Sequence, residues 1–184
     1  MKHIKTYLWI ILSIGLNINA SAQAYVIKSY DVALDIKIDG DIHVEETITV
    51  LFNEERRGIM REIPKSMKVD GSLQKVKLKN VSVQGFDYKL LSQGNNNVIR
   101  IGHPKKYLTG IQKYHISYTL KNVLLRASDH TAFQYNIISD WDTSIDTVNY
   151  SVNLPKEIDM HYSDYRVFTG ADYANERGAD ILKV

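Results

Sequence analysis

The carboxylates best placed to do acid–base chemistry gather in one short stretch of the chain. They are Glu45, Glu46, Glu54, Glu55 and Glu62. Acid–base catalysis on a sugar or acyl group needs two carboxylates, or a base beside a nucleophile, that converge on a cleft. These five side chains come from one predicted hairpin and the loop after it, and charge runs of this kind are usually solvated faces. We therefore expect no catalytic residues and a non-enzymatic protein, with a glycan-active hydrolase as the weaker alternative.

Glu46 breaks an apolar pattern. It has the same parity as Val44 and Ile48, so an uninterrupted strand would point its carboxylate at the core. A buried unpaired charge is costly, and proteins relieve the cost by pairing, hydrogen bonding or protonation. The nearest cations are Arg57 and Arg61, and a guanidinium binds a carboxylate through two hydrogen bonds. We predict a structural ion pair between Glu46 and Arg61, the alternative being a β-bulge at residues 45–46 that turns Glu46 to water.

Asp140, Trp141 and Asp142 form a second group with chemical potential. A tryptophan flanked by carboxylates in a loop is a common way to grip a sugar ring or a cation. The favoured alternative is that Trp141 closes one end of the core, as large aromatic side chains often do. A solvent-facing indole beside a concave acidic site would support ligand contact, and a buried indole would count against it.

The sequence offers no recognisable cofactor or metal site. Cysteine is absent, so disulfides and thiolate metal sites are excluded. The histidines do not fall at metal-ligand spacing, and there is no nucleophile elbow, phosphate loop or dinucleotide fingerprint. We expect neither a cofactor nor a metal.

The elements that position these residues are predicted to be β-strands. Apolar residues alternate over 30–38 and over 42–52, and Asp39-Gly40 between them tolerates the positive φ of a tight turn. Similar short runs recur near residues 76–83, 98–101, 114–120 and 148–154. Crossover helices are missing, and residues 56–61 could form one helical turn at most. The sequence predicts an all-β, antiparallel two-sheet β-sandwich, immunoglobulin-like in general architecture.

The first 24 residues have the three parts of a secretory signal. A basic start with Lys2 and Lys5 leads into an apolar stretch and then into small residues. Cleavage could follow Ala22 or Ala24, and retention as an uncleaved anchor is the less favoured alternative. We expect residues 25–184 to form one exported domain on the extracytoplasmic face of the membrane, in the periplasm or in the medium.

Charge argues against polyanionic partners. Removing Lys2 and Lys5 reduces the 23 basic residues to 21, which matches the 21 acidic residues. A neutral domain has little electrostatic attraction to phosphate backbones, so nucleic acid is not an expected partner. A membrane surface recognised by charge is not expected either.

Several segments, taken together, resemble a known family. In chain order they are Ser29-Tyr30-Asp31-Val32, Asp39-Gly40, Val44-Glu45-Glu46-Thr47-Ile48, Arg57-Gly58-Ile59-Met60-Arg61-Glu62-Ile63-Pro64, Tyr114-His115-Ile116-Ser117-Tyr118, Tyr135-Asn136, Trp141 and Asn153-Leu154-Pro155. Their order over residues 25 to about 170 resembles the bacterial and archaeal predicted membrane proteins of the domain of unknown function 2207 family. Gly58, Arg61 and Pro64 match hallmark positions of that family, as does Glu46.

The resemblance implies an extracytoplasmic β-rich domain that is normally followed by transmembrane helices and has no established activity. Membrane attachment is then expected in the full-length form but is not encoded in residues 25–184. Two alternatives are a truncated chain, which we favour, and a free-standing secreted form. A truncated sandwich would leave an open edge able to pair with another chain. The sequence therefore predicts an interaction module for a protein or glycan partner in the cell envelope, with a carbohydrate-binding or hydrolase accessory domain as the alternative.

Overall fold

The computed structural model describes residues 23–69, 71–126, 131–139 and 141–158, and all regular elements within them are β-strands. Residues 1–22, which contain most of the predicted export signal, and the residues after 158 lie outside the described residues. The strands are β1 (Tyr25–Ile36), β2 (Ile42–Arg56), β3 (Ile59–Pro64), β4 (Ser66–Val69), β5 (Ser72–Lys75), β6 (Lys77–Val83), β7 (Tyr88–Gln93), β8 (Asn96–Ile101), β9 (Leu108–Lys121), β10 (Leu124–Arg126), β11 (Thr131–Phe133) and β12 (Val148–Asn153).

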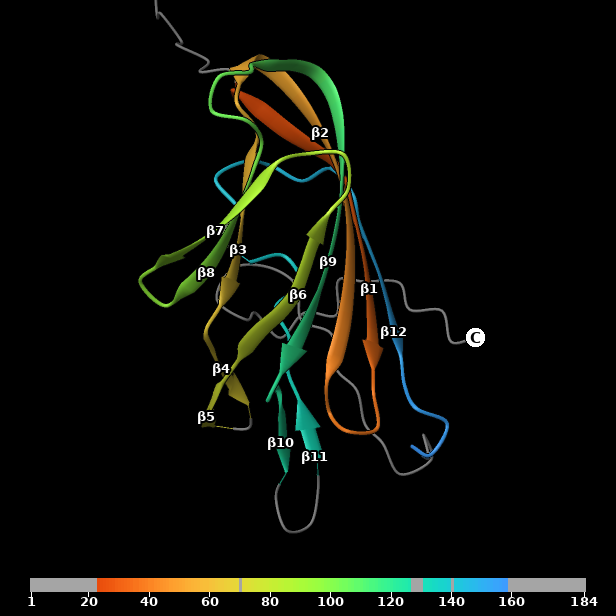
Figure 1. The fold of residues 1–184 in the computed structure, drawn as a ribbon. Coiled ribbons are helices and arrows are strands. Elements are labelled where there is room, and N and C mark those ends of the chain that lie inside the picture. Colours follow the sequence, from red (N-terminus) through yellow and green to blue (C-terminus); the bar gives the residue numbers. More distant parts are fainter. Residues whose placement is uncertain (1–22, 70, 127–130, 140, 159–184) are drawn as a thin grey trace, which may run out of the picture.

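The strands form a two-layer β-sandwich, which confirms the predicted fold class. A five-stranded sheet has the order β12-β1-β2-β9-β6, and a three-stranded sheet has the order β3-β8-β7. Figure 1 shows the smaller sheet beside the larger one, with the two-stranded sheets β4-β5 and β10-β11 at the lower end. The core lies between the two main sheets.

The hairpin between β1 and β2 forms where the alternation predicts it, but its turn differs from the expected one. The strands pair up to Ile36 and Ile42, and Lys37 N donates to Asp41 O at 2.8 Å to close the loop. Only Gly40 has positive φ, at 90°, because the loop contains three residues between its closing pair. Ile38, predicted as strand, therefore lies in the turn and is 67% exposed.

One strand pair departs from the antiparallel pattern. β12 runs parallel to β1, with Tyr30 opposite Val148 and Asp35 opposite Asn153. The expectation of purely antiparallel sheets assumed that a parallel pair needs a crossover helix. Here the chain returns to the edge of the sheet through β10 and β11, and the described residues of the connection contain no helix.

The predicted helical turn at residues 56–61 is wrong. β2 continues to Arg56, the chain turns at Gly58, and β3 begins at Ile59. Short segments take the structure that tertiary pairing offers, and Ile59 pairs with Ile101 on β8. Among the residues that the structure describes, no helix has the length and apolar character to cross a bilayer.

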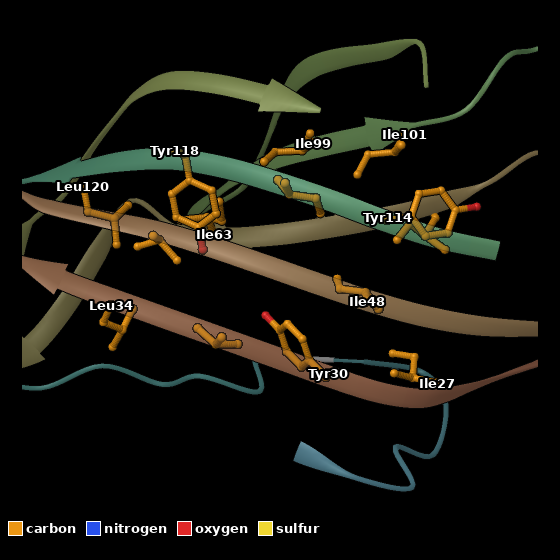
Figure 2. Packing of buried hydrophobic residues seen from close by; sticks show 14 of the residues in the cluster. Ile27, Tyr30, Leu34, Ile48, Ile63, Ile99, Ile101, Tyr114, Tyr118 and Leu120 are labelled. Carbon is orange, nitrogen blue, oxygen red and sulfur yellow. The ribbon is translucent and has the colours of Figure 1, made fainter. Parts of the chain in front are cut away.

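The core is built from alternate residues of the paired strands. Val32, Leu34, Val44 and Ile48 are at most 4% exposed, as their parity predicts. Figure 2 shows these inner faces meeting Ile63, Ile99 and Ile101 of the smaller sheet, with Tyr30, Tyr114 and Tyr118 between them.

Candidate functional site

Glu46 is buried in the centre of the five-stranded sheet. It lies opposite Val32 on β1 and Ile116 on β9, and the register continues through Glu45 without a shift. The expected alternative, a bulge at residues 45–46, is therefore absent from the structure. Glu46 is 1% exposed, so its carboxylate must find its partners inside the protein.

Arg61 of β3 meets this carboxylate from the opposite sheet. Its Nη2 lies 2.7 Å from Oε1 of Glu46, and its Nε lies 2.9 Å from Oε2. Arg61 is also 1% exposed. The two side chains thus form a bidentate ion pair that links the two layers of the sandwich. Arg57, the other candidate partner, instead lies on the surface and donates to the Tyr107 hydroxyl at 2.6 Å.

Two buried tyrosines complete the coordination of the carboxylate. The hydroxyl of Tyr30 on β1 donates to Glu46 Oε1 at 2.8 Å, and that of Tyr118 on β9 donates to the same oxygen at 2.6 Å. A third tyrosine, Tyr135, contacts the Tyr118 hydroxyl at 2.8 Å. The sequence analysis did not assign these tyrosines to the site. For Tyr30 and Tyr118, the inward parity on β1 and β9 was the available signal, but parity alone does not show which strands are neighbours.

The remaining N–H donors of Arg61 form hydrogen bonds with two other segments. Its Nη1 donates to the carbonyl of Glu62 at 2.8 Å and to the Ser139 hydroxyl, and its Nη2 reaches the carbonyl of Ile137 at 3.5 Å. The guanidinium therefore also fixes the segment around residues 137–139. Ser139 lies 78 residues from Arg61 in the chain, and no local sequence signal connects the two.

Burial shifts the titration of this cluster. Removal from water raises the pKa of Tyr30 and of Tyr118 well above the ordinary value, and the neighbouring Glu46 carboxylate raises both further. Burial likewise raises the pKa of Tyr135 to about 12. For Arg61, burial lowers the pKa and is the largest single cause, but the interactions with Glu46, Tyr30 and Tyr118 together outweigh it, and the guanidinium pKa is raised. The tyrosines therefore stay neutral donors and Arg61 stays a cation.

This arrangement is suited to stabilising the fold. Glu46 Oε1 accepts from Arg61, Tyr30 and Tyr118, and Oε2 accepts from Arg61, so both oxygens are engaged. A general acid or base needs access to a substrate proton. With an exposed fraction of 1%, the Glu46 carboxylate has no such access in this conformation.

Trp141 lies against the same cluster. Its ring meets that of Tyr30 edge-on at a centroid distance of 6.1 Å, and its Nε1 is buried without a hydrogen-bond partner. The indole is half-buried and packs partly against the core. Asp142 is exposed and accepts a hydrogen bond from the Tyr25 hydroxyl, while Asp140 lies outside the described residues. Ligand contact through Asp140, Trp141 and Asp142 therefore stays a prediction.

Gly58 is required by a close backbone crossing. A Cβ at this position would lie 1.9 Å from the carbonyl oxygen of Ile101, and a Cβ on Gly102 would lie 1.9 Å from that of Arg57. Both glycines also have positive φ, 135° and 124°. Gly102 was not singled out from the sequence. Pro64 ends β3 at the edge of the smaller sheet, where its missing N–H interrupts no ladder.

Other features of the described region are less suited to chemistry. No group of three metal-binding side chains comes together among the described residues. An open hollow of about 520 Å³ lies between the β6–β7 and β8–β9 connections, lined by Gly85, Phe86, Asp87, Gly102, His103, Lys106 and Leu108. None of the residues predicted as site residues lines it.

Comparison with known proteins identifies the family. The family model described as "Predicted membrane protein (DUF2207) N-terminal domain" matches residues 26–180. The chain belongs to this family. The matched range contains Glu46, Gly58, Arg61 and Pro64, so the ion pair and the glycine crossing are features of a DUF2207 domain in this chain.

Other comparisons add little. No curated protein matches the chain. Native leukotriene A4 hydrolase from Saccharomyces cerevisiae is 11% identical with a TM-score of 0.36, over 52% of this chain and 15% of that chain. An M1 zinc metallopeptidase from Deinococcus radiodurans is 13% identical with a TM-score of 0.31, over 54% of this chain and 20% of that chain. The chain thus spans a small part of these proteins, and the similarity carries no argument about activity.

Proposed function

We propose that this DUF2207 domain is an exported, non-enzymatic binding or interaction module, carried on the extracytoplasmic side of a membrane protein. The observation that carries the proposal is the commitment of Glu46 to the fold. Among the described residues it is the one fully buried carboxylate, and both of its oxygens bind donors that hold the two sheets together. Its role is to shape the sandwich, which leaves the outer surfaces to meet a partner.

The leader and the family support the placement of the domain. Residues 1–24 have the basic, apolar and small-residue parts of an export signal, and the family is that of a predicted membrane protein. A sandwich without cysteine needs no oxidising compartment, but it tolerates one without mispairing.

Labelling in intact cells tests the export. Because the chain has no cysteine, Lys89→Cys on the exposed face of β7 creates a single thiol. A membrane-impermeant maleimide should label it in cells whose inner membrane is intact. The matched control is the same variant without residues 1–24, which should be labelled only after lysis. Protection of the full-length variant until lysis would overturn the extracytoplasmic placement.

A paired substitution tests the non-enzymatic role. Replacing both members of a buried ion pair by apolar residues of similar size is often tolerated, whereas removing one is not. A folded Glu46→Met, Arg61→Met variant should therefore restore the wild-type phenotype when it is expressed in a deletion strain. If that variant is folded and exported to the normal level but fails to complement, Glu46 acts chemically and the proposal is wrong.

A further inference from the structure

The structure bears on the choice between the two cleavage sites at the end of the predicted export signal. A cut after Ala22 gives a mature chain that begins at Gln23, and a cut after Ala24 gives one that begins at Tyr25. The two products differ only by Gln23 and Ala24, which both lie within the described residues. The contacts of these two residues show what the second cut would remove from the folded domain.

Ala24 extends the pairing of β1 with β2. Tyr25 lies opposite Phe52, and the carbonyl of Ala24 accepts a hydrogen bond from the amide of Asn53 at 3.0 Å, which is the next step of the same register. The amide of Glu54 donates to the same carbonyl at 3.2 Å. In a chain that begins at Tyr25, both amides lose this acceptor.

Gln23 joins the end of β2 to the segment that precedes β12. Its carbonyl accepts a hydrogen bond from Nδ2 of Asn53 at 2.9 Å. Its side-chain oxygen, Oε1, accepts from Oγ of Ser144 at 2.8 Å and from the amide of Ser144 at 3.4 Å. Gln23 therefore contacts neighbours on both sides of the chain, as a residue inside a sheet does.

The segment that Gln23 contacts also pairs with the first residues of β1. The amide of Ile27 donates to the carbonyl of Ser144 at 3.1 Å, and Ile27 forms an isolated parallel bridge with Ile145. This bridge is in the same register as the parallel pairing of β1 with β12. The hydrogen bonds between Gln23 and Ser144 therefore lie at the start of the edge pairing that covers β1.

The exposure of the two possible N-termini differs as well. Cleavage creates an α-ammonium group, which is charged at neutral pH and is costly to withdraw from water without a partner. Gln23 is exposed, so an ammonium group there stays hydrated. Tyr25 is 8% exposed, and its ring packs on Phe52 with a centroid distance of 6.0 Å. A new charge on the backbone of Tyr25 would lie next to buried surface.

We propose that a signal peptidase cuts between Ala22 and Gln23, so that the mature domain begins with Gln23. Water adds across this peptide bond and leaves a carboxylate on Ala22 and an ammonium group on Gln23. The small residues Ala20 and Ala22 then occupy the two positions of the small-x-small site. The inference deepens the proposed function and rests on it, because only an exported chain meets a signal peptidase.

The N-terminal peptide of the exported chain tests the cleavage site. The chain with its signal is expressed in cells that export it, and the N-terminal peptide of the extracytoplasmic product is identified by mass spectrometry. It should begin at Gln23, either unchanged or lighter by one ammonia, because the α-amine of an N-terminal glutamine can displace the side-chain amide nitrogen to form a lactam. A product that begins at Tyr25, or one that keeps the signal, would overturn the proposal.

Two substitutions separate the alternative sites. Ala20→Gln removes a small residue that only the proposed site uses, so the precursor should accumulate in a pulse–chase experiment or the cut should move to the bond after Ala24. Ala24→Leu removes a small residue that only the other site uses, and should change neither the rate of processing nor the N-terminus. The opposite pair of results would contradict the proposal. Ala22 belongs to both sites, so its substitution does not discriminate.

Amide hydrogen exchange tests whether residues 23 and 24 belong to the folded domain. In the purified mature chain, the amides of Asn53 and Glu54 should exchange more slowly than in an unstructured peptide of the same sequence, because Ala24 accepts from both. Exchange at the unstructured rate would remove the structural basis of the proposal. The proposed function fails separately, by protection of Lys89→Cys in intact cells. A labelled Lys89→Cys chain that begins at Tyr25 would refute the cleavage site alone.

Discussion

Tyr118 and Tyr114 lie four residues apart on the same face of β9, and both are fully buried, but their surroundings differ. The Tyr118 hydroxyl donates to Glu46 and contacts Tyr135, in a half of the core that is fastened by hydrogen bonds. The Tyr114 hydroxyl has no partner, and its ring packs on Phe86 at a centroid distance of 4.6 Å. Figure 2 shows Tyr114 near Ile101, in a half of the core that is closed by apolar packing. Close by, the backbone crosses itself at Gly58 and Gly102.

The comparison shows two ways to join the same two sheets. In the polar half, the buried carboxylate of Glu46 on one sheet requires the guanidinium of Arg61 on the other. The contact between the sheets is therefore specific, and removing either residue should cost much of the free energy of unfolding. In the apolar half, the join depends on the absence of side chains at Gly58 and Gly102. Substitutions in the two halves should therefore fail for different reasons and by different amounts.

Removal of Arg61 should have the largest effect. Arg61→Ala leaves the Glu46 carboxylate buried with two tyrosine donors and no cation, which should lower the free energy of unfolding by about 3–5 kcal/mol. Denaturant unfolding measures the loss. Arg57→Ala removes an exposed arginine four residues earlier, in the β2–β3 connection, and should cost less than about 1 kcal/mol. Equal losses for the two arginines would show that the ion pair does not fasten the polar half.

A methyl group at Gly58 should be the next most costly change. Gly58→Ala forces Cβ against the Ile101 carbonyl and strains a backbone of positive φ, for a loss of about 3 kcal/mol. Gly71→Ala is the control, because Gly71 also has positive φ, 77°, but has nothing within 4 Å of the added Cβ. It should cost about 1 kcal/mol from backbone strain alone. The additional loss at Gly58 reports the close crossing together with the greater strain of its φ of 135°.

Substitution of Tyr118 in the polar half should cause the third-largest loss of stability. Tyr118→Phe removes a hydrogen bond to a buried carboxylate and should cost about 2 kcal/mol. Thermal and denaturant unfolding should agree on this loss. A variant as stable as the wild type would mean that Arg61 and Tyr30 alone satisfy Glu46.

Alkaline pH should weaken the polar half progressively. The pKa values of Tyr30, Tyr118 and Tyr135 are raised by burial in the folded state, and in the unfolded chain they return to about 10. The stabilisation that these three tyrosines contribute to the folded state is complete below pH about 10. It is lost as pH rises, by about 1.4 kcal/mol per pH unit for each tyrosine, through pH about 12 for Tyr135 and further for the other two. The slope of unfolding free energy against pH should be smaller by one such increment in Tyr118→Phe, and an unchanged slope would contradict this account.

The smallest effect on stability is expected from a substitution in the apolar half. Tyr114→Phe deletes a buried hydroxyl without a partner, so stability should change by less than about 0.5 kcal/mol or should rise. A loss comparable to that of Tyr118→Phe would show that the Tyr114 hydroxyl is satisfied in solution and that the two halves are alike.

Local patterns predicted those parts of the structure that depend on neighbouring residues. Alternation placed Val44, Glu46 and Ile48 on the inner face, and the cost of burying a charge led from Glu46 to Arg61. The β1–β2 hairpin followed from the same reasoning, although its turn contains one more residue than expected. In each case the signal lies within about 15 residues of the feature.

The remaining parts depend on contacts that are remote in sequence. Tyr118 lies 72 residues from Glu46, and Gly58 needs a glycine at 102 because two connections cross. The parallel pairing of β12 was missed because the described part of the connection that leads to it contains no helix. Periodicity assigns residues to faces, but it does not state which strands are neighbours.

The parallel edge pair also has a consequence for synthesis. Asn149 donates to Asp31 at 2.7 Å, and these residues are 118 positions apart. At a synthesis rate of roughly 5–20 residues per second, the strand that covers the outer edge of β1 is made about 6–24 s after β1 itself. During that interval the nascent chain carries an unprotected hydrogen-bonding ladder, and a holding chaperone that shields extended segments would find its target at residues 25–36.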